Sequence, residues 1–374
     1  MHIAIIGAGI TGLMSALELL EQGCSVTLFD QQAAGQAASW AGGGILSPMY
    51  PWRYPAPVNA LARHAKPMYQ DWNQKLQPFT GIDFQIHETG MLIFDESDFE
   101  IGLSYAATHQ EPQQQAKLLD QAKLQQINPR INQSKFKQAI YFPELANIRN
   151  PRLLQSIIRY LKQHPRVTWQ EDCKITRLNL QQGCVKSISD EHGRIFQADQ
   201  YVFTTGAWSQ YWSQQLGLEI PVQPVQGQML LFKTPENWLP TMCMNKVMYL
   251  IPRPDGHVLC GSSMRQVGFD TSPSSEIRQD ILQACIEMVP KLADFPLIKH
   301  GAGLRPSSPD GIPYIGKIPK LHNVWANFGH FRNGLCMGPA SGKLLAQLIL
   351  EQTPIVDPDP YDPVRLFEPS HLVL

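Results

Sequence analysis

The first thirty residues of the chain constrain its fold more than any other segment. Ile3 to Ile6 is a short, fully apolar run of the kind that forms a buried parallel strand. The sequence Gly7-Ala8-Gly9-Ile10-Thr11-Gly12 follows, then a helical pattern from Leu13 to Gln22 and a second apolar run from Ser25 to Phe29. This order of strand, glycine-rich turn, helix and strand predicts the opening βαβ unit of a dinucleotide-binding fold.

The three glycines and the acid that ends the second strand point to a nucleotide. Gly7 permits the tight turn, Gly9 lets the backbone approach a pyrophosphate, and Gly12 allows the helix to pack closely on the strand. Asp30 comes 18 residues after Gly12, near the spacing of about 20 at which a carboxylate accepts hydrogen bonds from ribose hydroxyls. The pattern predicts bound FAD or NAD and leaves the choice between them open.

Length and composition exclude several other classes of protein. A chain of 374 residues corresponds to about two domains. Lys and Arg number 31 against 32 Asp and Glu, so the net charge of −1 gives no general attraction to nucleic acid. The seven cysteines form no C-x-x-C pair, which favours free buried thiols in a reducing compartment over disulfides or a zinc site.

The apolar N-terminal stretch is not typical of a signal peptide. No positively charged segment precedes it and no small-residue cleavage site of the usual kind ends it. No later run of about 18 uncharged apolar residues is long enough to span a membrane. We therefore expect a cytoplasmic protein without a membrane span.

Periodicity predicts the remaining elements. Helices are expected over residues 57–77 (with a break at Pro67), 99–126, 150–163, 275–288 and 340–351. Asn150 and Pro151 suit the N-cap and first position of their helix. Strands are expected at 84–87 and 91–95, as a hairpin around Gly90, and at 201–205, 228–232, 247–251, 257–260 and 324–328. The Pro- and Gly-rich residues 304–316 predict a loop.

The order of these elements indicates interleaved domains. Alternating α/β patterns stand at the start, middle and end of the chain, with antiparallel-looking strands between them. The expected architecture is α/β. A Rossmann-like nucleotide domain comprises residues 1–55, 145–220 and 296–374. A β-rich substrate-binding domain on an antiparallel sheet comprises residues 56–144 and 221–295.

Three later motifs are candidates for chemistry, although each also has an ordinary structural explanation. The run from Ala38 to Pro48 contains three consecutive glycines, which suit a flat ring lying on bare backbone, or a flexible loop. Arg305 offers a planar fork that suits a carboxylate, or is a surface arginine in a turn. Gly329 to Leu335 joins an apolar strand to a helix, which gathers backbone N–H groups or simply connects the two.

In combination, six ordered motifs resemble the glycine oxidase branch of the D-amino-acid oxidase family of FAD-dependent flavoproteins. The resemblance runs through nearly the whole chain, and it implies a glutathione-reductase-like FAD-binding domain. It is carried by G-A-G-I-T-G at Gly7, A-S-W-A-G-G-G-I-L-S-P at Ala38, T-T-G-A-W at Thr204, Y-L-I-P-R at Tyr249, G-L-R-P-S-S-P-D-G at Gly303 and G-H-F-R-N-G at Gly329.

The resemblance also implies roles for particular residues. Related enzymes that tether FAD use a cysteine just before the loop that matches Ser307 to Asp310, where this chain has none, so non-covalent FAD is expected. Arg305 would clamp the substrate carboxylate with help from Tyr249 and Arg332, and Met264 would form a pocket wall. The cofactor-binding residues implied are Gly7, Gly9, Ile10, Thr11, Gly12, Asp30, Gln31, Ala38, Ser39, Gly43, Gly44, Ile45, Lys174, Ile175, Gly206, His330, Phe331, Asn333, Gly334 and Leu335.

By the same resemblance, the expected reaction is oxidative deamination of glycine, sarcosine or small D-amino acids. A hydride would pass from Cα to flavin N5, and the resulting imine would hydrolyse to glyoxylate and ammonia when the substrate is glycine. O2 would be reduced to H2O2. In similar proteins this step feeds dehydroglycine to thiazole formation in thiamine biosynthesis, which leaves a thiazole synthase partner and a homo-oligomer open.

Three alternatives share the fold. One is a D-amino-acid dehydrogenase that passes electrons to an acceptor other than O2. Another is a tRNA-modifying flavoprotein, which should need a basic surface or a fused domain, neither indicated by the charge and length. The third is a non-catalytic FAD-binding protein, which has no need of both Arg305 and Arg332.

Overall fold

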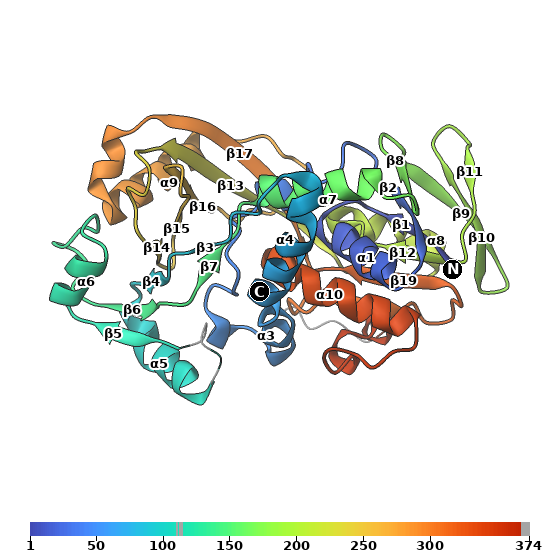
Figure 1. The fold of residues 1–374 in the computed structure, drawn as a ribbon, viewed down its shortest axis with the longest axis horizontal. Coiled ribbons are helices and arrows are strands. Elements are labelled where there is room, and N and C mark those ends of the chain that lie inside the picture. Colours follow the sequence, from blue (N-terminus) through green and yellow to red (C-terminus); the bar gives the residue numbers. More distant parts are fainter. Residues whose placement is uncertain (110, 112–114, 368–374) are drawn as a thin grey trace.

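The computed structural model of the chain describes residues 1–109, 111 and 115–367. The chain forms a six-stranded sheet and an eight-stranded sheet. Figure 1 shows them in the two halves of the molecule, the first with helices packed on it. Parts of the helix expected over 99–126, and of the segment expected to end at residue 374, lie outside the described residues.

The six-stranded sheet contains the predicted βαβ unit. Its strand order is β18-β19-β12-β1-β2-β8. All neighbours are parallel except β18 and β19. The bounds are β1 His2–Ile6, β2 Ser25–Phe29, β8 Val167–Gln170, β12 Gln200–Phe203, β18 Tyr314–Lys317 and β19 Val324–Phe328. The βαβ unit is confirmed, and the carboxyl ends of β1, β2 and β12 lie at one edge of the sheet.

The alternation of side chains along β1 explains the layers on its two faces. Ile3 and Ile5 belong to one buried cluster and Ala4 and Ile6 to another. The first cluster joins the sheet to α1 Ile10–Glu21, α4 Ala65–Thr80, α7 Asn150–Gln163 and α10 Gly334–Ile349. The second joins it to a small antiparallel sheet of β9 Ile175–Gln181, β10 Cys184–Asp190 and β11 Ile195–Phe196.

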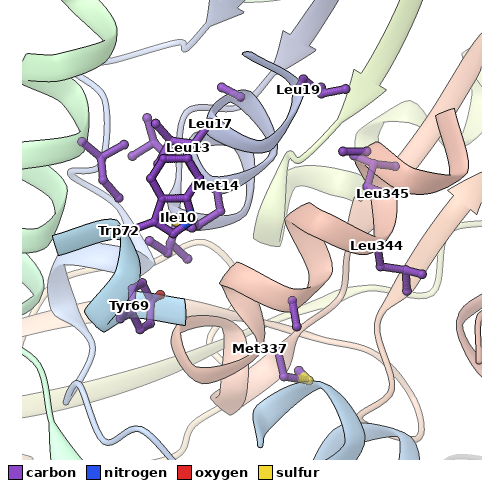
Figure 2. Close-up of a cluster of buried hydrophobic side chains, with 14 of the residues drawn as sticks. Ile10, Leu13, Met14, Leu17, Leu19, Tyr69, Trp72, Met337, Leu344 and Leu345 are labelled. Atoms are coloured by element: carbon purple, nitrogen blue, oxygen red, sulfur yellow. The ribbon is translucent and has the colours of Figure 1, made fainter. Parts of the chain in front are cut away.

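Figure 2 shows how the helices on the first face pack together. Apolar side chains of α1, including Leu13 and Leu17, meet Tyr69 and Trp72 from α4, with Met337 of α10 nearby. Tyr69 also supplies a hydrogen bond that helix α10 lacks. Pro339 has no N–H to give the carbonyl of Leu335 four residues earlier, and the Tyr69 hydroxyl donates to that carbonyl instead, at 2.8 Å. Helix α10 therefore begins at Gly334, not at residue 340 as expected.

The larger sheet has eight strands in the order β17-β13-β16-β15-β14-β4-β6-β5. Only the β14–β4 pair is parallel among these strands. The bounds are β17 Leu297–Ser307, β13 Gln223–Lys233, β16 His257–Gly261, β15 Tyr249–Pro252, β14 Met242–Met244, β4 Met91–Ile93, β6 Ala139–Phe142 and β5 Lys117–Leu119. Helices α5 Phe99–Thr108, α6 Gln121–Ile127 and α9 Ser275–Met288 lie on this half (Figure 1). The expected antiparallel sheet is thus present.

Several short strands and helices connect the larger elements. Strands β3 His87–Glu88 and β7 Ala146–Asn147 pair with each other. The short helices include α2 Ala38–Ala41, α3 Ala56–Ala62 and α8 Ser213–Leu216, and the 3₁₀ turns include η4 Gly206–Trp212 and η6 Phe331–Asn333. Within the described part of the chain, no helix is both long enough and apolar enough to cross a membrane.

Several local expectations are wrong. The hairpin around Gly90 does not form, because β3 pairs with β7 while β4 pairs with β6 and β14, which are far away in the sequence. The helix expected over 57–77 is divided into α3 and α4 at residues 63–64. Pro67 is not the break, since it lies in the first turn of α4, where a missing N–H removes no helical bond. The 99–126 stretch contains α5, β5 and α6.

Two helix starts and one loop also differ from expectation. Helix α1 begins at Ile10 and not at Leu13. In α7 the N-cap is Arg149, and Asn150 donates through its side chain to the carbonyls of Ser39 and Gly42 at 3.0 and 2.9 Å. The residues expected to begin a loop at 304 continue β17 as far as Ser307. A proline is tolerated at 306 because β17 is an edge strand.

Candidate functional site

A cavity of about 590 Å³ lies between the carboxyl edge of the six-stranded sheet and the face of the eight-stranded sheet. The motifs singled out in the sequence all contribute to its wall. Of the cofactor-binding residues expected from the sequence, each lines the cavity except Gly12. Tyr249, Arg305 and Arg332 line it too. One cavity thus brings together residues that lie more than 300 positions apart.

The glycine turn after β1 is held against the end of β12. Gly7 has a φ of +108°, and a Cβ on it would come within 2.5 Å of the Thr204 carbonyl oxygen. The hydroxyl of Thr204 donates to the Gly7 carbonyl at 2.5 Å. A Cβ at Gly12 would lie 2.7 Å from the same hydroxyl oxygen. Gly12 therefore shapes the turn from behind the wall, as its expected packing role requires.

The start of α1 opens toward the cavity beside Ser39. The backbone N–H of Ile10 donates to the Ser39 hydroxyl at 2.9 Å, so α2 is fastened to the first turn of α1. Gly9, Ile10 and Thr11 line the wall here. The other N–H groups of this first turn, together with the helix dipole, suit a bound anion such as a pyrophosphate.

Asp30 anchors the same turn from the end of β2. Its carboxylate accepts from the backbone N–H of Ala8 at 2.8 Å and of Gln32 at 3.1 Å. Burial raises the pKa of Asp30, while these two N–H groups act in the opposite direction. A carboxylate has about four lone-pair sites, so further acceptor capacity remains for a ribose hydroxyl. Lys174 follows Cys173, whose N–H donates to the Asp30 carbonyl at 2.8 Å. Lys174 and Ile175, the residues expected to meet the adenine, therefore lie at the Asp30 end of the cavity.

The glycine triplet forms a bare stretch of wall opposite Tyr249. A Cβ at Gly43 would lie 2.8 Å from Ile251 Cδ1 and 3.3 Å from Tyr249 Cε2. Gly44 has a φ of +82°, and a Cβ there would come within 2.5 Å of Asn150 Oδ1 and overlap the Ile148 carbonyl. No side chain larger than hydrogen fits at Gly44 without movement of the backbone. The triplet is a rigid surface rather than a flexible loop.

A buried arginine that the sequence reasoning passed over holds the triplet in place. Arg253 is 6% exposed, and it donates to the carbonyls of Gly43 and Ile148 at 2.8 Å each, and to the Asn147 side chain. Burial and the nearby Arg149 lower the pKa of Arg253 to about 9. Arg253 is the last residue of the motif Y-L-I-P-R. Its hydrogen-bond partners are far away in the sequence, so no local pattern indicates that it binds them.

Arg305 projects from β17 into the cavity. Its Nη1 donates to the Ser263 carbonyl at 3.1 Å and its Nη2 to the Ser262 hydroxyl at 2.6 Å. Burial lowers the pKa of Arg305, and the charge of Arg332 lowers it further, whereas Tyr249 acts in the opposite direction. Two of the guanidinium's five N–H groups are used by these contacts, so it retains donors for a carboxylate.

Tyr249 and Arg332 have few partners of their own. The Tyr249 hydroxyl lies 3.9 Å from the sulfur of Met229. Arg332 is exposed in η6, with its Nη2 3.8 Å from the sulfur of Met49. Across the described ranges no carboxylate forms an ion pair with Arg332. Both side chains therefore retain capacity to bind an anionic ligand.

Unsatisfied polar atoms at the starts of α10 and α7 border the cavity and suit a large polar ligand. Among the described residues, His330 Nε2, Asn333 Nδ2 and Asn150 Oδ1 are buried and have no hydrogen-bond partner. Burial lowers the pKa of His330 to about 3, which keeps the imidazole neutral. Buried polar atoms are nearly always paired in native proteins. The two unpaired atoms at the start of α10, together with the bare glycine surface, match the polar and flat parts of FAD, while Asn150 Oδ1 lies against Gly44.

The sequence reasoning placed one wall residue wrongly and missed several. Met264 is 62% exposed and does not line the cavity, because the segment after β16 turns its side chain to solvent. The wall is formed instead by Met229. The cavity also includes Gly227 and an aromatic pair at its rim, Tyr211 and Phe269, whose rings stack 5.1 Å apart. No local pattern marks these residues, since they meet only through the fold.

Comparisons with known proteins agree with this geometry. Residues 2–348 match the family model DAO, described as FAD dependent oxidoreductase. The chain is 40% identical to glycine oxidase of Pseudomonas putida over 362 residues, which is 97% of this chain and 98% of that relative. It is 30% identical to the bifunctional protein ThiO/ThiG of a Nostoc species, covering 94% of this chain and 53% of that relative.

The fold is likewise similar to solved structures. The crystal structure of glycine oxidase from Geobacillus kaustophilus superposes with a TM-score of 0.88, over 96% of this chain and 97% of that one, at 23% sequence identity. Iminodiacetate oxidase from a Chelativorans species superposes with a TM-score of 0.87 at 24% identity, over 96% and 98% of the two chains. At these identities the likeness concerns the fold.

Proposed function

The chain belongs to the DAO family of FAD-dependent oxidoreductases, and from that premise we propose that it oxidises glycine to the imine, which hydrolyses to glyoxylate and ammonia. O2 is the proposed electron acceptor and H2O2 the second product. Sarcosine and small D-amino acids are proposed as further substrates. The observation that carries the proposal is the position of Arg305, a half-buried guanidinium that lines the same cavity as Tyr249 and the glycine triplet and would bind a carboxylate there.

We propose non-covalent FAD as the bound cofactor, which supplies a hydride acceptor when it is present. The start of α1 and the Gly7 turn would hold the pyrophosphate, with Asp30 at the ribose and Lys174 and Ile175 at the adenine. Gly43 and Gly44 of the bare triplet, with Ile45 next to them, would face the flavin ring. The unpaired atoms of His330 and Asn333, with the N–H groups that begin α10, would bind its polar edge. Gln31, Ala38, Ser39, Gly206, Phe331 and Leu335 complete the proposed set.

The proposed roles of the other residues are binding and orientation. Arg305 binds the substrate carboxylate, and Tyr249 and Arg332 assist it. A clamped carboxylate fixes the position of Cα relative to the glycine triplet, which is the main catalytic contribution expected of a site without an obvious general base. The neutral amine needs no proton removed from it before the hydride leaves. Burial around Arg305 strengthens its attraction to the carboxylate because water is excluded.

We also propose how the chain is organised and which partner it serves. Residues 1–55, 145–220 and 296–374 would form the FAD-binding domain, and residues 56–144 and 221–295 the substrate-binding domain. The fused ThiO/ThiG relatives support a thiazole synthase as the consumer of the imine. The buried free thiols, such as Cys243 and Cys285, support a reducing, cytoplasmic location.

The test is to purify the protein, record its flavin spectrum, and follow oxygen uptake and H2O2 release with glycine, sarcosine, D-alanine and D-proline. We expect a yellow protein that consumes O2 with glycine and releases one H2O2 for each O2. Turnover with an artificial electron acceptor but not with O2 would instead favour a dehydrogenase. Absence of flavin, or flavin that stays on the precipitated protein in acid, would contradict the cofactor assignment.

A further inference from the structure

The two contacts that fix the Arg305 guanidinium are made by one segment of chain. Ser262 and Ser263, which accept hydrogen bonds from Arg305, begin the connection between β16 and α9 at residues 262–274. This connection contains no helix or strand, so its position depends on what fastens it to the sheet. The geometry of Arg305 depends on that fastening in turn.

Two glutamines on β13 attach this connection to the sheet. Gln226 and Gln228 are each 1% exposed. Because side chains alternate along a strand, both lie on the face opposite Gly227 and Met229, and neither lines the cavity. The backbone of Gln226 exchanges two hydrogen bonds with Arg265, at 2.8 and 3.0 Å. The backbone N–H of Gln228 donates to the Ser263 hydroxyl at 2.9 Å.

The two side-chain amides bind the far end of the same connection. Gln226 Nε2 donates to the Asp270 carbonyl at 2.8 Å, and Gln228 Oε1 accepts from the Ser274 N–H at 3.0 Å. The amides are joined to each other at 2.9 Å, from Gln228 Nε2 to Gln226 Oε1. His300 Nε2 lies 2.9 Å from Gln228 Oε1 on the opposite side. The near end of the connection is therefore attached to the backbone of the two glutamines, and the far end to their buried side-chain amides.

A pair of buried amides is not needed for packing alone, because apolar side chains of similar size fill such a space at less desolvation cost. A fully bonded polar network does fix one arrangement of the groups that it joins. We infer that Gln228, together with Gln226, is a positioning residue for the site. The two glutamines hold the 262–274 connection, so that Ser262 and Ser263 orient Arg305 toward the substrate carboxylate. This inference rests on the proposed function, since Arg305 is the proposed carboxylate clamp.

The test compares Gln228→Leu with the wild-type holoprotein. Acetate, a carboxylate that the enzyme has no means to deaminate, is titrated into the holoprotein by calorimetry, and FAD affinity is measured separately on the deflavinated protein. We expect the Kd for acetate and the KM for glycine each to rise about tenfold, because bonds to a charged partner are weakened. The expected change in kcat is less than threefold, and FAD affinity should stay within twofold of wild type.

A second variant and a control separate positioning from general damage. Ser263→Ala removes the hydroxyl that accepts from the backbone N–H of Gln228 and leaves both amides intact. It therefore tests the attachment at the near end of the connection, even if Gln228→Leu does not fold. It should raise the Kd for acetate in the same direction. Gln347→Leu removes a half-buried amide that accepts from the Ile355 N–H at 2.8 Å and does not line the cavity, and it should leave the Kd for acetate unchanged.

The outcomes distinguish the inference from the proposed function. Unchanged acetate binding in both Gln228→Leu and Ser263→Ala would overturn the inference, as would an equal loss of FAD affinity, because the effect would then not be specific to Arg305. If the wild-type protein does not oxidise glycine, the proposed function fails. The acetate titration still decides whether these glutamines position a carboxylate-binding arginine.

Discussion

The guanidinium of Arg305 lies against Gly227, in the space that a side chain at that position would occupy. A Cβ built on Gly227 would overlap Nη1, Cζ and Nη2 of Arg305. Gly227 stands on β13 opposite Gly303 of β17, two residues from Arg305 along that strand. The absence of a side chain on β13 is therefore a condition for the placement of the proposed clamp.

Gly227→Ala tests this relationship. The added methyl group should displace the guanidinium from its bonds to Ser262 and Ser263, while the flavin end of the cavity is untouched. We expect the KM for glycine to rise at least tenfold, a loss of about 1.4 kcal/mol in binding, with FAD content unchanged. Steady-state kinetics and the ratio of flavin to protein absorbance measure the two effects. A variant with wild-type KM would show that Arg305 does not bind substrate as placed.

Gly44→Ala should instead weaken FAD binding. The residue has a φ of +82°, and its Cβ would overlap the Ile148 carbonyl, so the triplet would have to move. Gly217→Ala is a matched control, because Gly217 has a φ of +68° but nothing within 4 Å of the added carbon. We expect Gly44→Ala to purify with less than a tenth of the wild-type flavin. Equal flavin content in the two variants would contradict a cofactor-facing triplet.

Met229→Ala should widen the range of substrates. The Met229 sulfur lies 3.9 Å from the Tyr249 hydroxyl, and its side chain lies over Gly261 inside the cavity. Removing it opens space next to the proposed position of Cα. We expect kcat/KM for D-alanine relative to glycine to rise about tenfold, the range that one or two methylene groups produce in an apolar pocket. Met264→Ala, at a side chain 62% exposed, should leave the ratio unchanged.

The βαβ unit and the cavity-lining glycines were predictable because their signals are local. Gly7, Gly9 and Asp30 lie within one strand–helix–strand segment, whose steric requirements are visible in the sequence. The family pattern predicts the role of Arg305, but the sequence does not predict that Arg305 lies in a strand. A Pro- and Gly-rich run was interpreted as a loop, whereas it continues an edge strand on which Pro306 gives up no sheet bond.

Residues that act through distant partners were not predictable in the same way. Arg253 bonds to Gly43, 210 positions away, and to the backbone of Ile148. The expected hairpin around Gly90 failed for the same reason, since the strand partners of β4 come from residues 139–142 and 242–244. Periodicity reports which side of an element is buried, but not which other element covers it.

Acid should destabilise the protein through His330. Burial lowers the pKa of His330 to about 3, against an unfolded value of about 6.5. Between these values the unfolded chain binds a proton that the folded chain does not, so the free energy of unfolding falls as the pH falls. From pH ~7 to ~5 this residue should account for about 2 kcal/mol. Denaturant unfolding of the wild type and His330→Gln at both pH values measures the difference. Identical losses in the two proteins would exclude His330 as the cause.

Anaerobic mixing of the holoprotein with glycine tests the central claim most directly. Without O2, electrons taken from the substrate stay on the flavin, so its visible absorbance should bleach fully with glycine and return when O2 is admitted, with one glyoxylate formed per flavin. Arg305→Met should retain the flavin but require at least a hundredfold more glycine for the same bleaching, because a charge-assisted bidentate contact is lost. A flavin that stays oxidised with saturating glycine, or an Arg305→Met variant that is reduced as readily as the wild type, would contradict the account.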